Sequence, residues 1–265
     1  MSAVDLWCCV TKEREVKTTR IMSSLAHGWG DKAQIVRGAP PQDQSAFAVW
    51  GHLWLAESII PPAIKDNRPF WFIDNGYWKA ARDDPENGHY RLTYRGRAPV
   101  ALNKPDYERG AASGVKIKPW RKSGRHVVIA TQSNQFGRPF GIDAPAWAAS
   151  IEQRVRQHTD RPVVVRPKGS LRPLSADLRD CWALVTHSSN AAVEAVALGI
   201  PVFVEPDSAA AQVGNRDLSD MENPLMPDGR EQWWNSLMCQ QFSLGEMHDG
   251  TAYRHLSRVR EQVDG

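Results

Sequence analysis

The segment from His126 to Val204 constrains the fold most, because short apolar runs alternate in it with polar, helix-forming stretches. The four runs are His126–Ala130, Pro162–Arg166, Trp182–Thr186 and Ile200–Val204. They lack a helical period and are short enough for buried strands, so they predict a parallel sheet. The helices expected between them are Ala144–His158 with Asp143 as N-cap, Ala176–Asp180, and Ser188–Leu198 closed by Gly199. This alternation predicts a small doubly wound α/β unit.

The first half of the chain repeats this rhythm. Strands are expected at Val4–Val10, Gln34–Val36, Ala46–Trp50, Pro69–Ile73 and His89–Tyr94. A helix is expected to run through Ile59 and to end at Pro61-Pro62, and Asp74-Asn75-Gly76 is expected to turn the chain after a strand. This order favours parallel βαβ units over a β-sandwich.

The predicted fold class is therefore α/β, with two Rossmann-like halves whose parallel sheets face each other across a cleft. A chain of 265 residues is long enough for two domains. We place the first at residues 1–120 and the second at 121–245, with a C-terminal helix or tail at 246–265 that packs back on the first.

Composition narrows the class of protein. No apolar run approaches the roughly 20 residues that span a bilayer, and the N-terminus lacks the order of a signal peptide. The four cysteines show no CxxC pairing and no histidine at zinc spacing, which favours reduced, buried thiols and no metal. We therefore expect a cytoplasmic protein without a membrane partner.

Basic residues surround one tryptophan near the middle of the chain. The cluster consists of Lys116, Lys118, Trp120, Arg121, Lys122 and Arg125. Such a group suits contact with a nucleic-acid backbone or a nucleotide. It equally suits a solvated linker between domains, which Pro119 and Gly124 favour.

The strongest site signal is the polar turn after the strand Trp182–Thr186. Ser188, Ser189 and Asn190 stand where a helix begins, and free N–H groups at such a point favour a phosphate or another anion. Glu194 lies in the same helix and suits hydrogen bonds from sugar hydroxyls. A plain N-cap with Glu194 facing water explains the same residues, so both interpretations stay open.

Polar groups follow two further strands of this half. Thr131, Gln132 and Ser133 follow one strand, Arg166 and Lys168 end another, and His187 belongs to the turn above. Open α/β sheets bind ligands at the carboxyl ends of their strands, so these groups are expected to share one ligand-binding edge.

In the first half, His52 and Asp74 each follow a strand, and either suits a general base. The chain contains no GxGxxG, GxxxxGK[ST], GxSxG or HExxH motif, which argues against dinucleotide dehydrogenases, P-loop kinases and zinc proteases.

Several segments resemble glycosyltransferases of the GT-B fold, with two Rossmann-like domains. The stretch ALGIPVF at 197–203 is similar to their C-terminal half and to related nucleotide-sugar epimerases. FWFIDNGYWK at 70–79 resembles the Glu-Asp-Gly-Phe strand end of capsule-type sugar transferases, with Asp74-Asn75 in place of the acidic pair. THSSNAAVEA at 186–195 resembles their Ser-Ser nucleotide site, whereas Arg166-Pro167-Lys168 lacks their His-Pro dipeptide. The segment 228–253 resembles the ending of small glycosyltransferase-like proteins of bacteriophages.

The resemblance implies a metal-independent glycosyltransferase without a cofactor, which uses a nucleotide-sugar donor such as a UDP-sugar. It implies an acceptor-side N-terminal domain with Asp74 near the acceptor hydroxyl, and a nucleotide-sugar-binding C-terminal domain. The implied donor residues are Arg166, Lys168, Ser188, Ser189, Asn190 and Glu194.

The bacteriophage resemblance implies hydroxymethylated pyrimidines in double-stranded DNA as the acceptor, in a host cytoplasm. A glycan acceptor of the capsule type is the alternative. A nucleotide-sugar epimerase or hydrolase, and a non-enzymatic nucleic-acid-binding protein on the same fold, are the other hypotheses.

Overall fold

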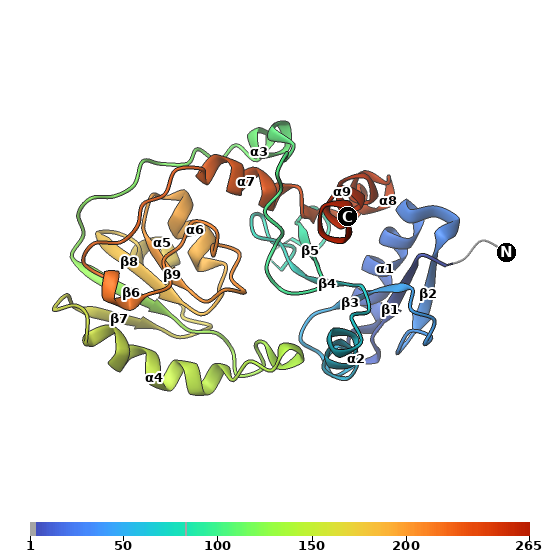
Figure 1. Cartoon of the computed structure of the whole chain (residues 1–265), viewed down its shortest axis with the longest axis horizontal. Coiled ribbons are helices and arrows are strands. Elements are labelled where there is room, and N and C mark those ends of the chain that lie inside the picture. The colour runs from blue at the N-terminus through green and yellow to red at the C-terminus, as the bar shows by residue number, and fades with distance from the viewer. Residues whose placement is uncertain (1–3, 83) are drawn as a thin grey trace. The chain divides into compact units, whose positions relative to one another are not determined.

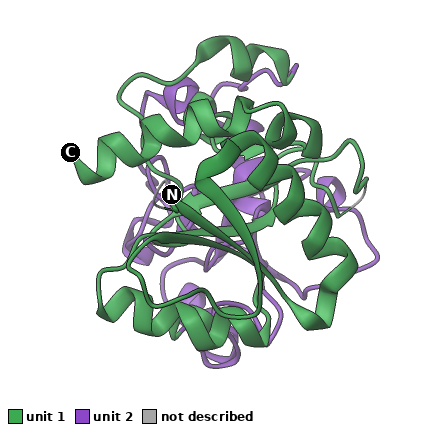
Figure 2. Ribbon diagram, turned by 90° about the vertical axis from the view of Figure 1, so that its right-hand side faces the viewer, with its two compact units in different colours: residues 1–113, 138–141, 235–265 green, residues 114–137, 142–234 purple. Residues whose placement is uncertain are grey.

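The computed structural model describes residues 4–82 and 84–265, which divide into two compact units (Figure 2). Unit 1 comprises Met1–Ser113, Arg138–Gly141 and Asn235–Gly265, and unit 2 comprises Gly114–Gly137 and Ile142–Trp234. Each unit contains its own sheet and its own apolar core. In the described part of the chain, no helix combines the length and apolar character that crossing a membrane requires.

The sheet of unit 1 has six strands in the order β10-β5-β4-β3-β1-β2 (Figure 1). The strands are β1 (Leu6–Val10), β2 (Ala33–Arg37), β3 (Ala46–Trp50), β4 (Phe70–Asn75), β5 (Tyr90–Tyr94) and β10 (Gln241–Phe242). The first four are parallel as predicted, whereas β5 runs antiparallel to β4 and to β10. Antiparallel pairing needs no helical crossover, and accordingly no helix lies between β4 and β5 among the described residues.

Apolar side chains from both faces of this sheet are buried, which explains why its strands read as continuous apolar runs. The helices of this unit include α1 (Glu15–Trp29), α2 (Trp54–Lys65) and α3 (Tyr107–Ala112), and η3 (Arg138–Phe140) belongs to it as well. One cluster packs α1 on the sheet, and a second packs α2 on the sheet.

The prediction that Pro61-Pro62 ends a helix was wrong, because α2 continues to Lys65 with both prolines inside it. Each proline lacks the N–H that would bond four residues back, at Glu57 and Ser58. Both prolines are exposed, so water can satisfy carbonyls on that side of the helix.

Asp74 and Asn75 also differ from the expected turn, since they are the last residues of β4. Asp74 is in register with Arg91 of β5, and Asn75 with Tyr90. The turn begins only at Gly76, whose amide donates to the His89 carbonyl at 2.8 Å.

Unit 2 confirms the predicted doubly wound unit. Its four parallel strands are β6 (His126–Ala130), β7 (Val163–Arg166), β8 (Cys181–Thr186) and β9 (Val202–Val204), in the order β7-β6-β8-β9. The helices are α4 (Ala144–Arg156), α5 (Leu174–Asp177) and α6 (Ala191–Ala197), with a 3-10 turn, η4 (Leu218–Asp220). The Asp143 carboxylate accepts the amide of Ala146 at 2.9 Å, which confirms that N-cap.

The C-terminal segment belongs to both units. Helix α7 (Arg230–Met238) starts in unit 2 and ends in unit 1, and β10, α8 (Leu244–His248) and α9 (Thr251–Asp264) follow in unit 1. Both α8 and α9 contact α1, and Leu256 and Val259 of α9 join the core of unit 1.

Candidate active site

The strand order places a topological switch point in each sheet. In both sheets the first strand lies between the second and the third, so the chain adds the second strand on one side of the first and the third strand on the other. Such a switch point opens a crevice at the carboxyl ends of the first and third strands. In unit 1 these strands are β1 and β3, and His52 follows β3; in unit 2 they are β6 and β8, followed by Thr131 and His187.

In unit 1 the structure brings the two predicted catalytic residues together. His52 Nε2 lies 3.6 Å from Asp74 Oδ2, and both side chains are largely buried. Arg91 Nη2 donates to the same Asp74 oxygen at 3.0 Å, and the Asn75 amide donates to Asp74 Oδ1 at 2.7 Å. The His52 ring lies 5.1 Å from the Phe72 ring, between centroids.

Electrostatics assign different roles to these two side chains. Burial alone would raise the pKa of Asp74, but the Arg91 guanidinium and the hydrogen bond from His52 outweigh it and hold that pKa well below its usual range. Burial lowers the pKa of His52, and although Asp74 acts in the opposite direction, Arg97 and Arg91 lower it further. At neutral pH Asp74 is therefore a weak base held by an arginine, whereas His52 is a neutral imidazole that can accept a proton.

Sequence reasoning missed four other residues around this pair. Arg91 and Tyr77 are buried, and the guanidinium carbon of Arg91 lies 5.4 Å from the Tyr77 ring centroid. Lys17 of α1 lies 4.0 Å from the Trp50 ring centroid, and burial lowers its pKa while Asp74 partly offsets this. Arg97 is buried against Phe140. Arg91 belongs to a strand that the sequence did identify, but only the antiparallel register of β5 reveals that it meets Asp74.

We predict that the pKa of His52 lies below the ordinary histidine value of 6.5, and that replacing Asp74 with asparagine lowers it further. The carboxylate stabilises the imidazolium, so its removal leaves burial and the neighbouring arginines to favour the neutral ring. Nuclear magnetic resonance titration of the histidine ring signals, assigned with a His52→Gln variant, measures both values. A His52 pKa above 6.5 in the parent protein would contradict the assignment.

In unit 2 the polar residues after β6 and β8 meet at the switch point. With the Gln132 amide oriented so that its oxygen faces the donors, this oxygen accepts the amides of Ser188 at 2.8 Å and Ser189 at 3.0 Å. The Gln132 side chain also lies 3.0 Å from Thr186 Oγ1. The amides before α6 are therefore organised by a side chain from the neighbouring strand end, and a bound anion would compete with Gln132 for them.

His187 is held in a defined orientation beside these amides. Its Nδ1 lies 3.2 Å from Asp207 Oδ1, and Ser188 Oγ donates to Asp207 Oδ2 at 3.3 Å. The rings of Phe136 and Trp147 meet the imidazole edge to face, each at 5.8 Å between centroids. Sequence reasoning missed Asp207, although it follows β9 and the search for polar residues at strand ends would have found it.

The remaining donor residues are distributed unevenly. Glu194 and Ser133 are exposed, and Asn190 and Thr131 are half-buried. Arg166 ends β7, an edge strand that β6 separates from β8, and its guanidinium bonds to the buried carboxylate of Asp177. Arg172 contacts the same carboxylate at 2.9 Å. The sequence suggested a diphosphate for Arg166, whereas the structure pairs this arginine with an internal acid. Lys168 is exposed in the following loop.

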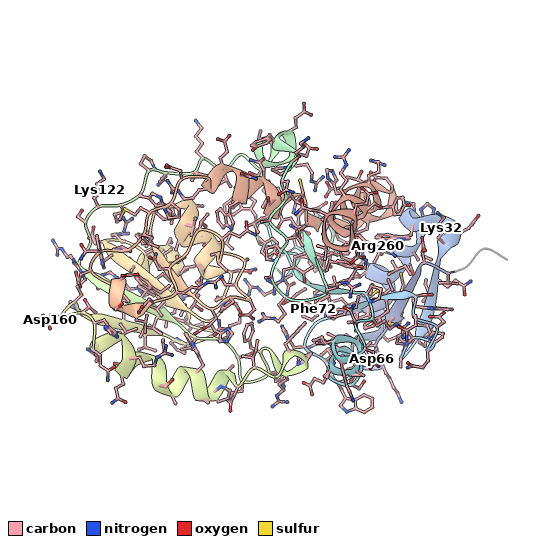
Figure 3. All side chains as sticks on the ribbon, viewed as in Figure 1. Lys32, Asp66, Phe72, Lys122, Asp160 and Arg260 are labelled. Atoms are coloured by element: carbon pink, nitrogen blue, oxygen red, sulfur yellow. The ribbon has the colours of Figure 1, made fainter. Side chains whose placement is uncertain are left out.

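The basic segment is largely tied to unit 2. Trp120 Nε1 donates to the Pro227 carbonyl at 3.0 Å, and the Arg230 guanidinium covers its ring at 3.9 Å. Arg121 donates to the carbonyls of Leu178 at 3.0 Å and Cys181 at 2.8 Å. The predicted contacts of Trp120 with bases would require Arg230 to leave the covered face. Lys116, Lys118 and Lys122 are exposed, and Lys122 projects outward (Figure 3).

All four cysteines are buried free thiols. Among residues 4–82 and 84–265, no group of three or more histidine, cysteine, aspartate or glutamate side chains is arranged to hold a metal ion.

Comparisons with known proteins give a likeness in fold. The chain matches no protein-family model and no curated protein sequence. It is similar to the solved structure of Thermosulfurimonas dismutans KpsC, beta Kdo 2,7 transferase, with a TM-score of 0.54 and 11% identity over 94% of this chain and 99% of that one. The beta Kdo 2,4 transferase of KpsC from the same organism gives a TM-score of 0.47 and 11% identity, over 89% of this chain and 90% of that one. The first likeness, which spans nearly the whole of both chains, confirms the GT-B-like fold and the resemblance in fold to capsule-type sugar transferases.

Proposed function

We propose that this chain is a nucleotide-sugar-dependent glycosyltransferase in which unit 1 activates the acceptor and unit 2 binds the donor. The observation that carries the proposal is that each unit gathers polar residues at the switch point of its own sheet. In unit 1 these include a neutral histidine beside an ionised aspartate, which suits deprotonation of a hydroxyl. In unit 2 they include backbone amides, hydroxyls and a histidine, which suit a phosphate and a sugar.

His52 is the proposed general base. Its Nε2 faces Asp74, so Nδ1 is the nitrogen that accepts the proton of the acceptor hydroxyl. The acceptor oxygen forms a bond to the anomeric carbon of the donor sugar, and the bond from that carbon to the phosphate oxygen breaks. The nucleotide leaves with the electron pair, and His52 carries the proton. Asp74 stabilises the imidazolium and orients the ring, as in other histidine–aspartate pairs.

The leaving nucleotide is proposed to bind before α6. Its phosphate oxygens would replace the Gln132 oxygen on the amides of Ser188 and Ser189. Hydrogen bonds to an oxygen that gains charge in the transition state are worth several kcal/mol in buried sites, roughly 3–4. Glu194 and Asn190, which are in or next to α6, are proposed to contact the sugar or the nucleoside.

A glycan hydroxyl is the acceptor that we favour, because the structure with the TM-score of 0.54 is named as a transferase of the sugar Kdo. Hydroxymethylated DNA has less support, since Trp120 and Arg121 bond within unit 2. The exposed lysines of the basic segment favour it.

Incubating the protein with a panel of nucleotide sugars, including UDP-sugars and sugars of nucleoside monophosphates, tests the proposal. Acidic and neutral oligosaccharides and hydroxymethylated DNA serve as acceptors, with and without EDTA, and mass spectrometry detects nucleotide release and added sugar. Transfer that resists EDTA would support metal independence. Failure of every donor to bind or to react would refute the transferase assignment.

We predict that replacing His187 with alanine weakens nucleotide binding by about tenfold or more, the loss of one good polar contact. His187 sits at the switch point of unit 2 beside the amides of Ser188 and Ser189. His158 is the matched control, because it is exposed and precedes β7 at the opposite ends of the strands. Calorimetric titration of both variants with the donor that the panel identifies measures the affinities. Equal losses of affinity in the two variants would contradict the placement of the nucleotide before α6.

A further inference from the structure

Gln241, in the short strand β10, holds the turn that follows Asp74. Gln241 of β10 is buried, with 2% of its surface exposed. Its Oε1 accepts the amide of Tyr77 at 2.8 Å and that of Trp78 at 3.0 Å. A single side-chain oxygen therefore satisfies two consecutive backbone donors that lie more than 160 residues earlier in the chain.

This turn fits closely against Gln241. It leaves β4 directly after Asp74 and Asn75. A Cβ atom placed on Gly76 would lie 2.7 Å from the His89 carbonyl oxygen and 3.0 Å from Gln241 Oε1. Because distances under 3.0 Å are not tolerated by a Cβ atom, any residue larger than glycine at this position would push the turn away from these groups.

Gln241 also reaches the site through the sheet. Its backbone pairs with Arg91 in the antiparallel β10–β5 ladder, and Arg91 is in register with Asp74. Arg91 donates to the same Asp74 oxygen that faces His52. The glutamine thus contacts both segments that hold the carboxylate, the turn after it and the strand beside it.

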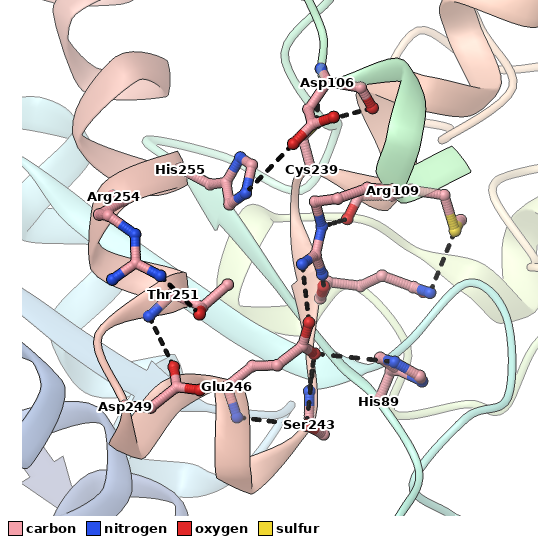
Figure 4. Close-up of polar contacts among 12 residues, drawn as sticks. His89, Asp106, Arg109, Cys239, Ser243, Glu246, Asp249, Thr251, Arg254 and His255 are labelled. Carbon is pink, nitrogen blue, oxygen red and sulfur yellow. Dashed lines mark hydrogen bonds and ion pairs between the residues drawn. The ribbon is translucent and has the colours of Figure 1, made fainter. Parts of the chain in front are cut away.

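Gln241 is itself fixed by an ion-paired arginine of α3. Arg109 donates to the Gln241 carbonyl at 2.9 Å, to the Met238 carbonyl at 3.0 Å and to Glu246 at 2.7 Å. Glu246 completes a capping box with Ser243 at the start of α8 and lies 3.8 Å from His89 (Figure 4). The Gln241 amide nitrogen lies 3.3 Å from the Met238 sulfur.

We propose that Gln241 is a positioning residue for the His52–Asp74 pair. Its side-chain oxygen holds the Gly76–Trp78 turn so that Asp74 stays at the end of β4, facing the imidazole. That this arrangement serves catalysis rests on the proposed function. That Gln241 holds Asp74 beside His52 does not.

The test compares two adjacent glutamines in the folded, full-length protein. Gln241→Met keeps the length of the side chain and removes the acceptor. Gln240→Met is the matched control, because Gln240 is fully buried and bonds to Val100 and Ser236 rather than to the turn. Thermal melts of both variants measure the loss of stability that follows from replacing either buried side-chain amide.

The decisive readout is the pKa of His52, followed by nuclear magnetic resonance. The charged groups that act on this ring are Asp74 of β4, Arg91 of β5 and Arg97 after β5. Asp74 stabilises the imidazolium, so a loosened turn weakens that contribution and shifts the pKa downward in Gln241→Met. Gln240→Met is expected to leave it unchanged. No shift in Gln241→Met, or an equal shift in both variants, would overturn the proposal.

A second pair of variants disturbs the turn without changing the glutamine, in case Gln241→Met does not fold. Gly76→Ala pushes the turn away from the intact Gln241 and is expected to shift the pKa of His52 in the same direction. Gly96→Ala is the control, since a Cβ there meets nothing within 4 Å. An unchanged His52 pKa in Gly76→Ala would overturn the proposal independently of the glutamine.

Activity supplies a third readout once a donor and acceptor are known. Small misplacements of reacting groups lower turnover by about 10- to 100-fold, and we expect such a loss in kcat with little change in KM for Gln241→Met. A downward pKa shift without any sugar transfer by the parent protein would refute the proposed function alone. Full kcat in Gln241→Met would refute the positioning role alone.

Discussion

Replacing His52 with glutamine is expected to lower sugar transfer by about 100- to 10,000-fold, the usual contribution of a general base. The variant should fold, because the side chain is partly exposed, at 17%, and makes a ring contact with Phe72 that glutamine can largely fill. Binding of the nucleotide sugar should change little, since the residues proposed to hold it belong to unit 2. The measurement is kcat and KM with the donor and acceptor found in the panel.

The pH dependence of kcat/KM gives a second test of His52 as the base. Because the pKa of His52 is lowered, the imidazole is neutral at neutral pH, and kcat/KM should fall only in acid, below the ordinary histidine value of 6.5. In His52→Gln this acid limb should disappear from the residual activity.

The control is His255→Gln, since His255 is also a half-buried histidine beside an aspartate, 3.9 Å from Asp106. It belongs to α9 and not to a strand end. Comparable losses in both variants would show that any buried histidine of this unit supports activity and would exclude His52 as the base.

Most strands could be predicted from the sequence because buried parallel strands require short apolar runs. His126–Ala130 and Ala46–Trp50 were predicted to the residue, and the strands of unit 2 follow in the expected order. The direction of β5 relative to β4 could not be predicted, because alternating polar and apolar residues occur in parallel and in antiparallel strands alike. Helix α2 extends beyond its prolines although local propensity predicts a break, and both prolines lie on the exposed side of the helix, where water can bond the carbonyls that they leave without a partner in the helix.

The candidate site was predicted where it depends on strand ends and missed where it depends on register. His52, Gln132 and His187 follow strands, Asp74 ends one, and the sheet order brings these residues into two clusters. Antiparallel pairing is what brings Arg91 to Asp74 and Gln241 to the turn after it, and Gln241 lies in a strand of two residues that no periodicity reveals. Arg166 stands at a strand end as the sequence predicted, but its guanidinium pairs with the buried carboxylate of Asp177.

Replacing Arg91 with methionine is expected to destabilise the protein by about 3–5 kcal/mol, the cost of removing one partner of a buried ion pair. Asp74 would keep its position inside unit 1 but lose the guanidinium that lies 3.0 Å away. Arg156→Met is the control: its pair with Glu152 is half-exposed and spaced four residues apart on a helix, so the loss should stay below about 0.5 kcal/mol. Urea denaturation followed by circular dichroism measures both.

The loss in Arg91→Met should also depend on pH in a defined direction. A carboxyl group with a lowered pKa contributes stability above its unfolded value, near 3.8 for aspartate, and this contribution disappears as the pH falls through the folded pKa. Without Arg91 that pKa rises, so the deficit of the variant should be largest near neutral pH and should shrink in acid as Asp74 takes up a proton. Removing both charges in Arg91→Met/Asp74→Asn should restore part of the stability at pH 7, because no unpaired charge is then buried. A double variant that is less stable than Arg91→Met at pH 7 would mean that Asp74 is held chiefly by groups other than Arg91.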